Sequence, residues 1–210
     1  MKQISSPLQA CHPANALTYA SLLAAVAAIA CATSGFEAVT GGLIAVSVIA
    51  DTFDGRFARF FYRDDAELAV GVQLDSLSDA IAFGIAPAIC ATLLLPEQSA
   101  WTASLQILWW MAAGAYAAAA ITRLAFYNVT CASKAGFVGL PVPVAALIWA
   151  TALLFTPGPR ASIALFTITA AAMVLPLPIP RPTGLGLAAF ACWPAAVIAL
   201  SVALWLRAGS

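Results

Sequence analysis

Long stretches without a single charged residue constrain the fold of this chain more than any other feature. A helix needs about 20 consecutive apolar residues to cross the hydrocarbon layer of a membrane. Five charge-free runs reach that length, and two shorter ones flank the charged stretch 51–79. The seven runs span 3–36, 38–50, 80–96, 98–122, 135–159, 161–180 and 182–206. A chain with this pattern is expected to fold within a membrane.

We therefore predict an all-α, polytopic membrane bundle of about seven transmembrane helices. The two short runs reach spanning length only if their helices continue into the charged stretch between them. The sequence contains no internal repeat, linker or low-complexity tract, so a single domain is expected over residues 1–210. The expected helices cover 14–33, 37–60, 68–95, 101–127, 137–156, 161–179 and 184–206.

Composition excludes several classes of protein. Hydrophobic residues make up 63% of the chain and charged residues 9%, against roughly 45–50% and 25% in soluble domains. So few charges cannot cover the surface of a soluble enzyme, and no basic face is available for nucleic acid. The five cysteines have no CxxC spacing and His12 is the only histidine, which argues against a zinc site.

Lysine and arginine are distributed unevenly between the two ends of the expected helices. Cytoplasmic loops of membrane proteins carry an excess of these residues. If the amino terminus is cytoplasmic, only Arg160 and Arg207 fall on the outer side. The cytoplasmic side then holds Lys2, Arg56, Arg59, Arg63, Arg123, Lys134 and Arg181. We therefore expect an inner-membrane protein whose stretch 51–79 faces the cytoplasm.

Seven of the nine acidic residues lie between positions 51 and 79. Asp51 and Asp54 are three residues apart and Asp75 and Asp79 are four apart, so each pair shares one helix face. The two helices are joined by a short turn and should be antiparallel neighbours. If their acidic faces meet, four carboxylates converge. A solvated turn is expected for Asp64, Asp65 and Glu67.

Four converging carboxylates require neutralisation, because charges at membrane helices are costly. Oxygen ligands without histidine or cysteine favour Mg²⁺, Mn²⁺ or Ca²⁺. Two such ions are a recurring device for displacement at phosphorus. The alternatives are ion pairing with Arg56, Arg59 or Arg63, and a cation transporter that uses the acidic cluster as its transit site.

The acidic stretch also resembles a known signature. The pattern D-x2-D-G-x2-A-R followed by G-x3-D-x3-D is similar to that of the CDP-alcohol phosphotransferase family. Residues 60–70 separate its two halves, a longer interval than the usual family pattern has. The matching positions are Asp51, Asp54, Gly55, Ala58, Arg59, Gly71, Asp75 and Asp79.

Three further segments resemble the phosphatidylserine synthases within that family. They are residues 75–88, 123–128 and 137–143, and the resemblance as a whole covers about 15–145. One departure is Phe126, which stands where the family stretch R-L-A-R-F-N has its second arginine.

The resemblance implies a metal-assisted transfer of a phosphatidyl group from CDP-diacylglycerol to an alcohol, with CMP as product. Asp51, Asp54 and Asp75 would bind two divalent cations, Mg²⁺ or Mn²⁺, and Asp79 would share one of them. Asp79 would also deprotonate the attacking hydroxyl, as a positioned carboxylate can.

The remaining site residues follow from the same resemblance. Gly55, Ala58 and Arg59 would lie along the nucleotide. Arg123 would bind a phosphate or carboxylate on the acceptor side, together with Asn128, or would anchor the end of its helix at the membrane surface.

L-serine is the acceptor that the resemblance favours, and a homodimer in membrane lipid is the expected assembly. Other acceptors stay open, namely glycerol phosphate, inositol phosphate and choline, and so does an archaeal-type lipid donor.

Overall fold

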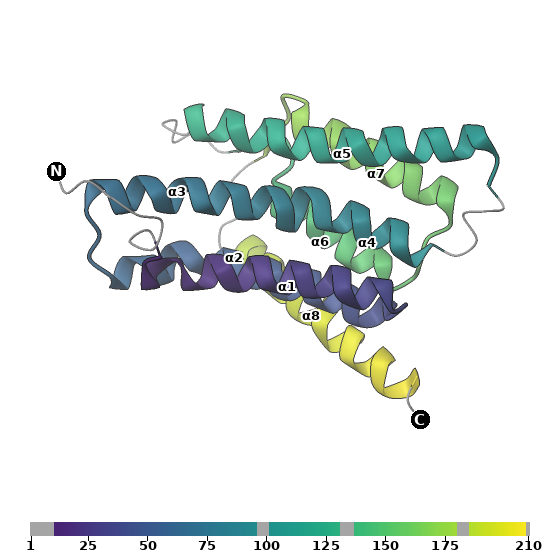
Figure 1. Cartoon of the computed structure of the whole chain (residues 1–210), viewed down its shortest axis with the longest axis horizontal. Helices are drawn as coiled ribbons and strands as arrows, with labels where there is room; N and C mark the ends of the chain where they lie inside the picture. Colours follow the sequence, from purple (N-terminus) through teal and green to yellow (C-terminus); the bar gives the residue numbers. More distant parts are fainter. Residues whose placement is uncertain (1–10, 96–100, 131–136, 180–184, 209–210) are drawn as a thin grey trace.

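The computed structural model describes residues 11–95, 101–130, 137–179 and 185–208. In these residues the chain forms helices, most of which run side by side along the long axis of the molecule, whereas the last helix runs obliquely away from them (Figure 1). They are α1 (Ala16–Thr33), α2 (Glu37–Phe57), α3 (Asp65–Asp79), α4 (Ala86–Leu94), α5 (Ala103–Thr130), α6 (Val142–Leu153), α7 (Pro159–Val174) and α8 (Leu185–Ala208).

Short helical turns extend three of these helices into longer rods. Pro13–Asn15 precedes α1, Ala58–Phe60 follows α2, and a π-helical turn at Ala80–Ile85 joins α3 to α4. Within the described residues, four rods are long and apolar enough to cross a membrane, and α6, α7 and the part Cys192–Ala208 of α8 are shorter apolar helices. The four rods are Pro13–Thr33, Glu37–Phe60, Asp65–Leu94 and Ala103–Thr130. The prediction of an all-α, polytopic membrane bundle is confirmed.

The predicted helix 137–156 was too long by five residues at its start and by three at its end, and the predicted helix 161–179 was too long by five residues at its end. The chain is extended before α6 because Gly139 has a φ of 74° and Pro141 precedes the helix. Phe137–Val138 (β1) pairs antiparallel with Pro178–Ile179 (β2), beyond the end of α7. Apolar composition does not distinguish these short extended segments from helix, which is why the sequence missed them.

Small residues let α2 approach two other helices closely. A Cβ atom at Gly41 would lie 2.6 Å from the carbonyl oxygen of Ala150 in α6. A Cβ atom at Gly42 would overlap the Ser201 hydroxyl of α8, which donates a hydrogen bond to the Ala38 carbonyl. Small residues serve the same purpose in membrane helices generally.

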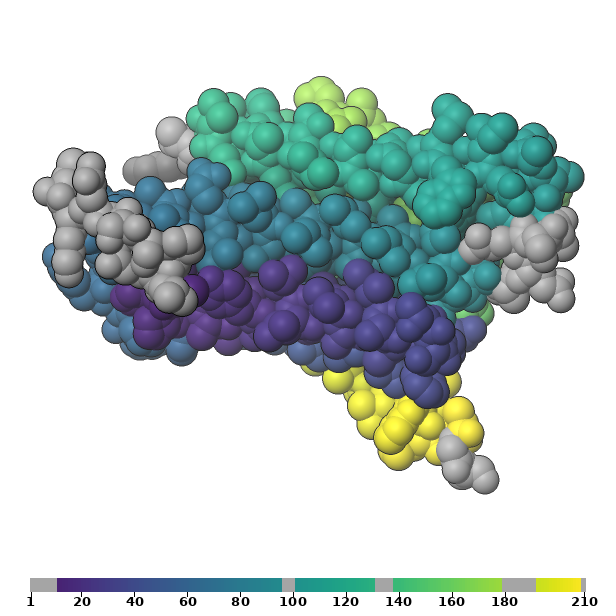
Figure 2. Space-filling model, viewed as in Figure 1, coloured from purple at the N-terminus to yellow at the C-terminus, as the bar shows by residue number. Residues whose placement is uncertain are grey.

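A buried aromatic cluster joins α5, α6 and α7. Trp149 stacks on Phe166 with 3.9 Å between ring centroids, and Trp109 and Tyr116 each lie 5.5 Å from Phe166. All four side chains are at most 1% exposed. Figure 2 shows α1, the α3–α4 rod and α5 packed along one face, with α8 projecting from the body at its carboxyl-terminal end.

Candidate active site

The turn between α2 and α3 brings the acidic stretch together at one end of the bundle (Figure 1). Asp64 accepts a hydrogen bond from the Glu67 backbone N–H, and the Glu67 carboxylate accepts one from the Asp64 N–H, each at 2.9 Å. This capping box starts the helix at Asp65, three residues before the predicted start. Asp64 and Glu67 therefore cap α3, although the sequence predicted a solvated turn.

The four signature aspartates converge between α2 and α3. One carboxylate oxygen each from Asp51, Asp54 and Asp75 lies within 4.8 Å of the other two. The Asp79 carboxyl lies beside that of Asp51, and the Asp75 carboxyl beside that of Asp54. All four side chains are half-buried. Each pair lies on one helix face, as the residue spacing predicted, and the two faces meet.

Ion pairing does not account for this cluster. Over the described residues, the aspartates contact Thr18 and one another, and no ion pair joins them to Arg56, Arg59 or Arg63. Like charges at such short range repel. An explanation by structural salt bridges is therefore not supported.

The donor set fits a hard divalent cation. The cluster offers carboxylate oxygens alone, which Mg²⁺ and Mn²⁺ accept. One of these atoms, Asp75 Oδ1, is buried without a hydrogen-bond partner. An unpartnered buried carboxylate oxygen is costly unless a cation or donor meets it. Asp51, Asp54 and Asp75 can thus hold a metal ion, with Asp79 adjacent.

The sequence prediction missed two residues from the amino-terminal rod. Thr18 donates a hydrogen bond to Asp54 Oδ2 at 3.0 Å and is 6% exposed. Asn15 is 4% exposed, and its Nδ2 has no hydrogen-bond partner. The available signal was a series of polar residues spaced three apart, Asn15, Thr18 and Ser21, on one face of a mostly apolar helix.

Gly71 makes room for two of these polar side chains. A Cβ atom there would lie 2.9 Å from Arg63 Nη1 and 3.3 Å from Asn15 Oδ1. The signature glycine therefore lets α3 pack against a guanidinium and an amide. Arg63, which the sequence offered only as an ion-pair partner, lies against this part of α3.

The three residues predicted to lie along the nucleotide differ in environment. Gly55 and Arg59 are exposed, whereas Ala58 is 8% exposed and begins the turn after α2. A Cβ atom at Gly55 would meet nothing within 4 Å. No protein contact requires a glycine there, so open space lies beside the acidic cluster.

Arg123 is buried in α5, which excludes the alternative of a surface anchor. It is 7% exposed, its Nη2 donates to the Gly139 carbonyl at 3.2 Å, and its Nε has no partner. Asn128, further along α5, exchanges hydrogen bonds with Ser76, the residue after Asp75. The structure thus connects the predicted acceptor-side residues to α3 and to the segment before α6.

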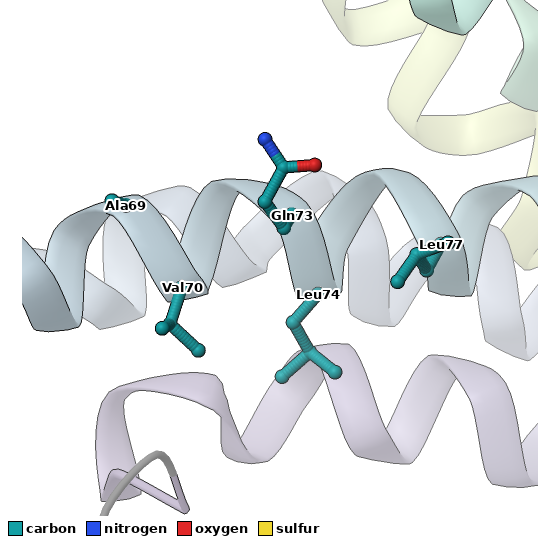
Figure 3. A pocket seen from close by; sticks show the side chains of 5 residues that line it. All are labelled: Ala69, Val70, Gln73, Leu74 and Leu77. Atoms are coloured by element: carbon teal, nitrogen blue, oxygen red, sulfur yellow. The ribbon is translucent and has the colours of Figure 1, made fainter. Parts of the chain in front are cut away.

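A separate pocket of about 340 Å³ lies on another face of α3. Its lining includes Val70, Leu74 and Leu77, and Val70 and Leu74 point toward the amino-terminal helix (Figure 3). At 3.6 residues per turn, this face is turned by about 150° from Asp75 and Asp79. The pocket contains none of the predicted site residues.

Similar proteins carry names that match this chemistry. A protein from Mycobacterium tuberculosis named CDP-diacylglycerol–serine O-phosphatidyltransferase is 33% identical over 140 residues, which are 63% of this chain and 46% of the relative. One of the same name from Helicobacter pylori is 29% identical over 136 residues, 64% of this chain and 54% of the relative. The archaetidylserine synthase of Methanothermobacter thermautotrophicus is 36% identical over 105 residues, 50% and 42% of the two chains.

The matches thus span about half the length of these relatives. A family model covers far more of this chain. The model of CDP-alcohol phosphatidyltransferase matches residues 11–205, which include α1 to α8 almost completely. The chain therefore belongs to the CDP-alcohol phosphatidyltransferase family.

Proposed function

We propose that this protein transfers a phosphatidyl group from CDP-diacylglycerol to L-serine and releases CMP, at the cytoplasmic face of the membrane. The observation that carries the proposal is the convergence of four aspartates from two antiparallel helices. An integral membrane protein of this family can meet a lipid-linked nucleotide at the boundary between lipid and water. The names of the relatives from Mycobacterium tuberculosis and Helicobacter pylori support serine as acceptor.

Asp79 is the proposed general base. Its carboxylate takes the proton of the serine hydroxyl, provided that the hydroxyl reaches hydrogen-bond distance. The serine oxygen forms a bond to the phosphorus that carries diacylglycerol. The bond from that phosphorus to the bridging oxygen breaks, and CMP leaves with the oxygen and its electron pair.

Asp51, Asp54 and Asp75 are the proposed ligands of two divalent cations, Mg²⁺ or Mn²⁺, with Asp79 sharing one. When bound, the ions supply positive charge that stabilises the charge on the phosphates during displacement. Thr18 holds Asp54 through its 3.0 Å hydrogen bond. This contact keeps one ligand oriented before the substrate arrives.

The open space at Gly55 supports a nucleotide site beside the cluster. Arg59 is exposed on the same turn of chain, where its guanidinium can pair with phosphate oxygens. Ala58 is small and buried, so it contributes close packing of the turn. On the acceptor side, the unpartnered Nε of Arg123 leaves a donor for the serine carboxylate.

The distribution of arginines supports a cytoplasmic site. Arg56 lies in the last turn of α2, and Arg59 and Arg63 lie between α2 and α3. Arg160 lies in the first turn of α7 and Arg207 in the last turn of α8, at the opposite end of the bundle (Figure 1). Positive residues favour the cytoplasmic side. Outside the described residues lie Lys2, Lys134 and Arg181.

An archaeal-type lipid donor is the second candidate. The relative from Methanothermobacter thermautotrophicus is named archaetidylserine synthase. The names of the three relatives thus agree on serine and differ in the lipid. The acceptor and the donor therefore have to be tested separately.

The deciding experiment is CMP release by the purified protein in lipid vesicles, with each donor and a panel of alcohols, with and without Mg²⁺ or Mn²⁺. We expect turnover with CDP-diacylglycerol and serine that requires the metal. Turnover with glycerol phosphate, inositol phosphate or choline, and none with serine, would contradict the proposal that serine is the acceptor. Absence of CMP with every pair would contradict the reaction. Light scattering of the same preparation tests the expected homodimer.

A further inference from the structure

The rod that carries Asp75 and Asp79 changes its helical form directly after Asp79. Residues Ala80–Ile85 form a π-helical turn, and α4 continues from Ala86. A π-helical turn inserts an extra residue into an α-helix, and such turns are frequent at functional sites. Each extra residue rotates the two halves of the rod against each other by about 100°. The face that the aspartates present to α2 therefore depends on this turn.

A proline leaves this turn short of one hydrogen-bond donor. In a regular helix the N–H of residue 87 would serve the carbonyl of Phe83, and Pro87 has no N–H. Both Phe83 and Pro87 are buried. A donor from another helix that reaches this buried carbonyl therefore adds a hydrogen bond that Pro87 cannot make.

Tyr116 of α5 supplies that donor. Its hydroxyl donates to the Phe83 carbonyl at 2.8 Å, and the Tyr116 side chain is fully buried. The ring is fixed in turn by Phe166 and Trp149, at 5.5 and 6.4 Å between centroids. The π-helical turn is thus fastened to the aromatic core by one hydrogen bond.

Close packing strengthens the same junction. A Cβ atom at Gly84 would lie 3.1 Å from the Ala120 Cβ of α5. Phe83 follows Asp79 by four residues, which is about 6 Å along a helix axis. A displacement of the turn would therefore displace Asp79 by a similar amount.

We propose that Tyr116 is a positioning residue, whose hydrogen bond to Phe83 holds the π-helical turn and thereby aims Asp79 and Asp75 at the carboxylates of α2. This inference rests on the proposed phosphatidyl transfer and on the metal site of the four aspartates. We assign Tyr116 no contact with substrate or metal; it acts through the Phe83 carbonyl.

The test is Tyr116→Phe, which removes the hydroxyl and keeps the ring. Thr92→Val is the matched control, because Thr92 accepts a partly buried hydrogen bond from Trp109 at 3.0 Å between the same rod and α5. Thr92 lies thirteen residues beyond Asp79, about 20 Å along a helix axis. Both proteins are compared for kcat, KM, thermal unfolding and Mn²⁺ affinity measured by electron paramagnetic resonance.

We expect Tyr116→Phe to lower kcat by about 10-fold to 100-fold, as loss of an orienting partner does. The KM for CDP-diacylglycerol should change by less than about twofold, because the bond lies outside the nucleotide site, and Mn²⁺ binding should weaken. Thr92→Val should keep both kcat and Mn²⁺ affinity. An unchanged Tyr116→Phe enzyme, or equal losses in both variants, would overturn the inference.

A second variant and a second measurement also test the inference. If Tyr116→Phe does not fold, Gly84→Ala perturbs the same junction and should give the same drop in kcat with a steady KM; full activity of that variant would overturn the inference. If the unmodified protein releases no CMP with any donor and acceptor, the proposed function fails. The Mn²⁺ affinities of Tyr116→Phe and Thr92→Val then decide this inference alone.

Discussion

The helices around the acidic cluster and those around the aromatic core are held together by different means. Between α1 and α2 the apolar packing is supplemented by polar contacts, with Ser21 and Ser47 hydroxyls 2.8 Å apart and Thr18 bonded to Asp54. Between α6 and α7 the contact is apolar, with Trp149 stacked on Phe166.

The acidic cluster and the aromatic core therefore have different roles, chemistry in the first and stability in the second. Four carboxylates in one small volume repel and destabilise the fold when no cation is bound. Large buried rings contribute dispersion contacts and stabilise it. We therefore expect substitutions at the cluster to affect chemistry first, and substitutions at the aromatic core to affect stability first.

The largest effect is expected for Asp79→Asn. Loss of a general base lowers turnover by about 10³-fold, and the isosteric amide should leave folding and metal binding in place. Asp65→Asn on the same helix is the matched control, since Asp65 is exposed and outside the cluster. CMP release and thermal unfolding measure both variants. Full turnover in Asp79→Asn would reject Asp79 as the base.

Phe166→Ala should destabilise the protein by about 3 kcal/mol, because it leaves a cavity among buried rings. Turnover per folded molecule should fall less than in Tyr116→Phe, since Phe166 only packs against the Tyr116 ring and contacts none of the four aspartates in the described contacts. Phe155→Ala, at a 68% exposed position, is the control. Thermal unfolding in detergent measures the loss. A large fall in turnover with unchanged stability would contradict the separation of tasks.

Metal removal should destabilise the protein as well as stop the reaction. A ligand present at about 100 times its dissociation constant stabilises the folded state by about 2.7 kcal/mol. Chelation should therefore lower the unfolding temperature, and Mg²⁺ or Mn²⁺ should restore it. Asp51→Asn should weaken this response to metal. The absence of any metal-dependent shift would contradict the proposed ligand set.

Thr18→Val is expected to have the smallest effect of this series, about a tenfold loss of turnover. It removes the hydroxyl that orients Asp54 and keeps the shape of the side chain. Thr33→Val is the control on the same helix, where the hydroxyl bonds only to the Ala30 carbonyl in the described contacts. Equal activities of the two variants would show that Asp54 needs no such support.

Much of this architecture was predictable from local pattern. The charge-free runs located the helices to within a few residues at most ends, because a membrane span must be apolar over its whole length. The spacing of Asp51, Asp54, Asp75 and Asp79 placed each pair on one helix face. The contribution of Thr18 and Asn15 was not predictable, because it depends on where α1 lies against the α2–α3 hairpin.

The sequence by itself determined that this is a helical membrane protein in which each of two helices carries a pair of aspartates on one face, since both follow from residue type and helical period. That the two faces meet depends on how α2 and α3 pack. Only the tertiary structure decided that Arg123 binds the Gly139 carbonyl and that Tyr116 bonds to the π-helical turn after Asp79. Such contacts join residues 16 and 33 positions apart in the chain. Their formation depends on how whole helices pack, which no local pattern specifies.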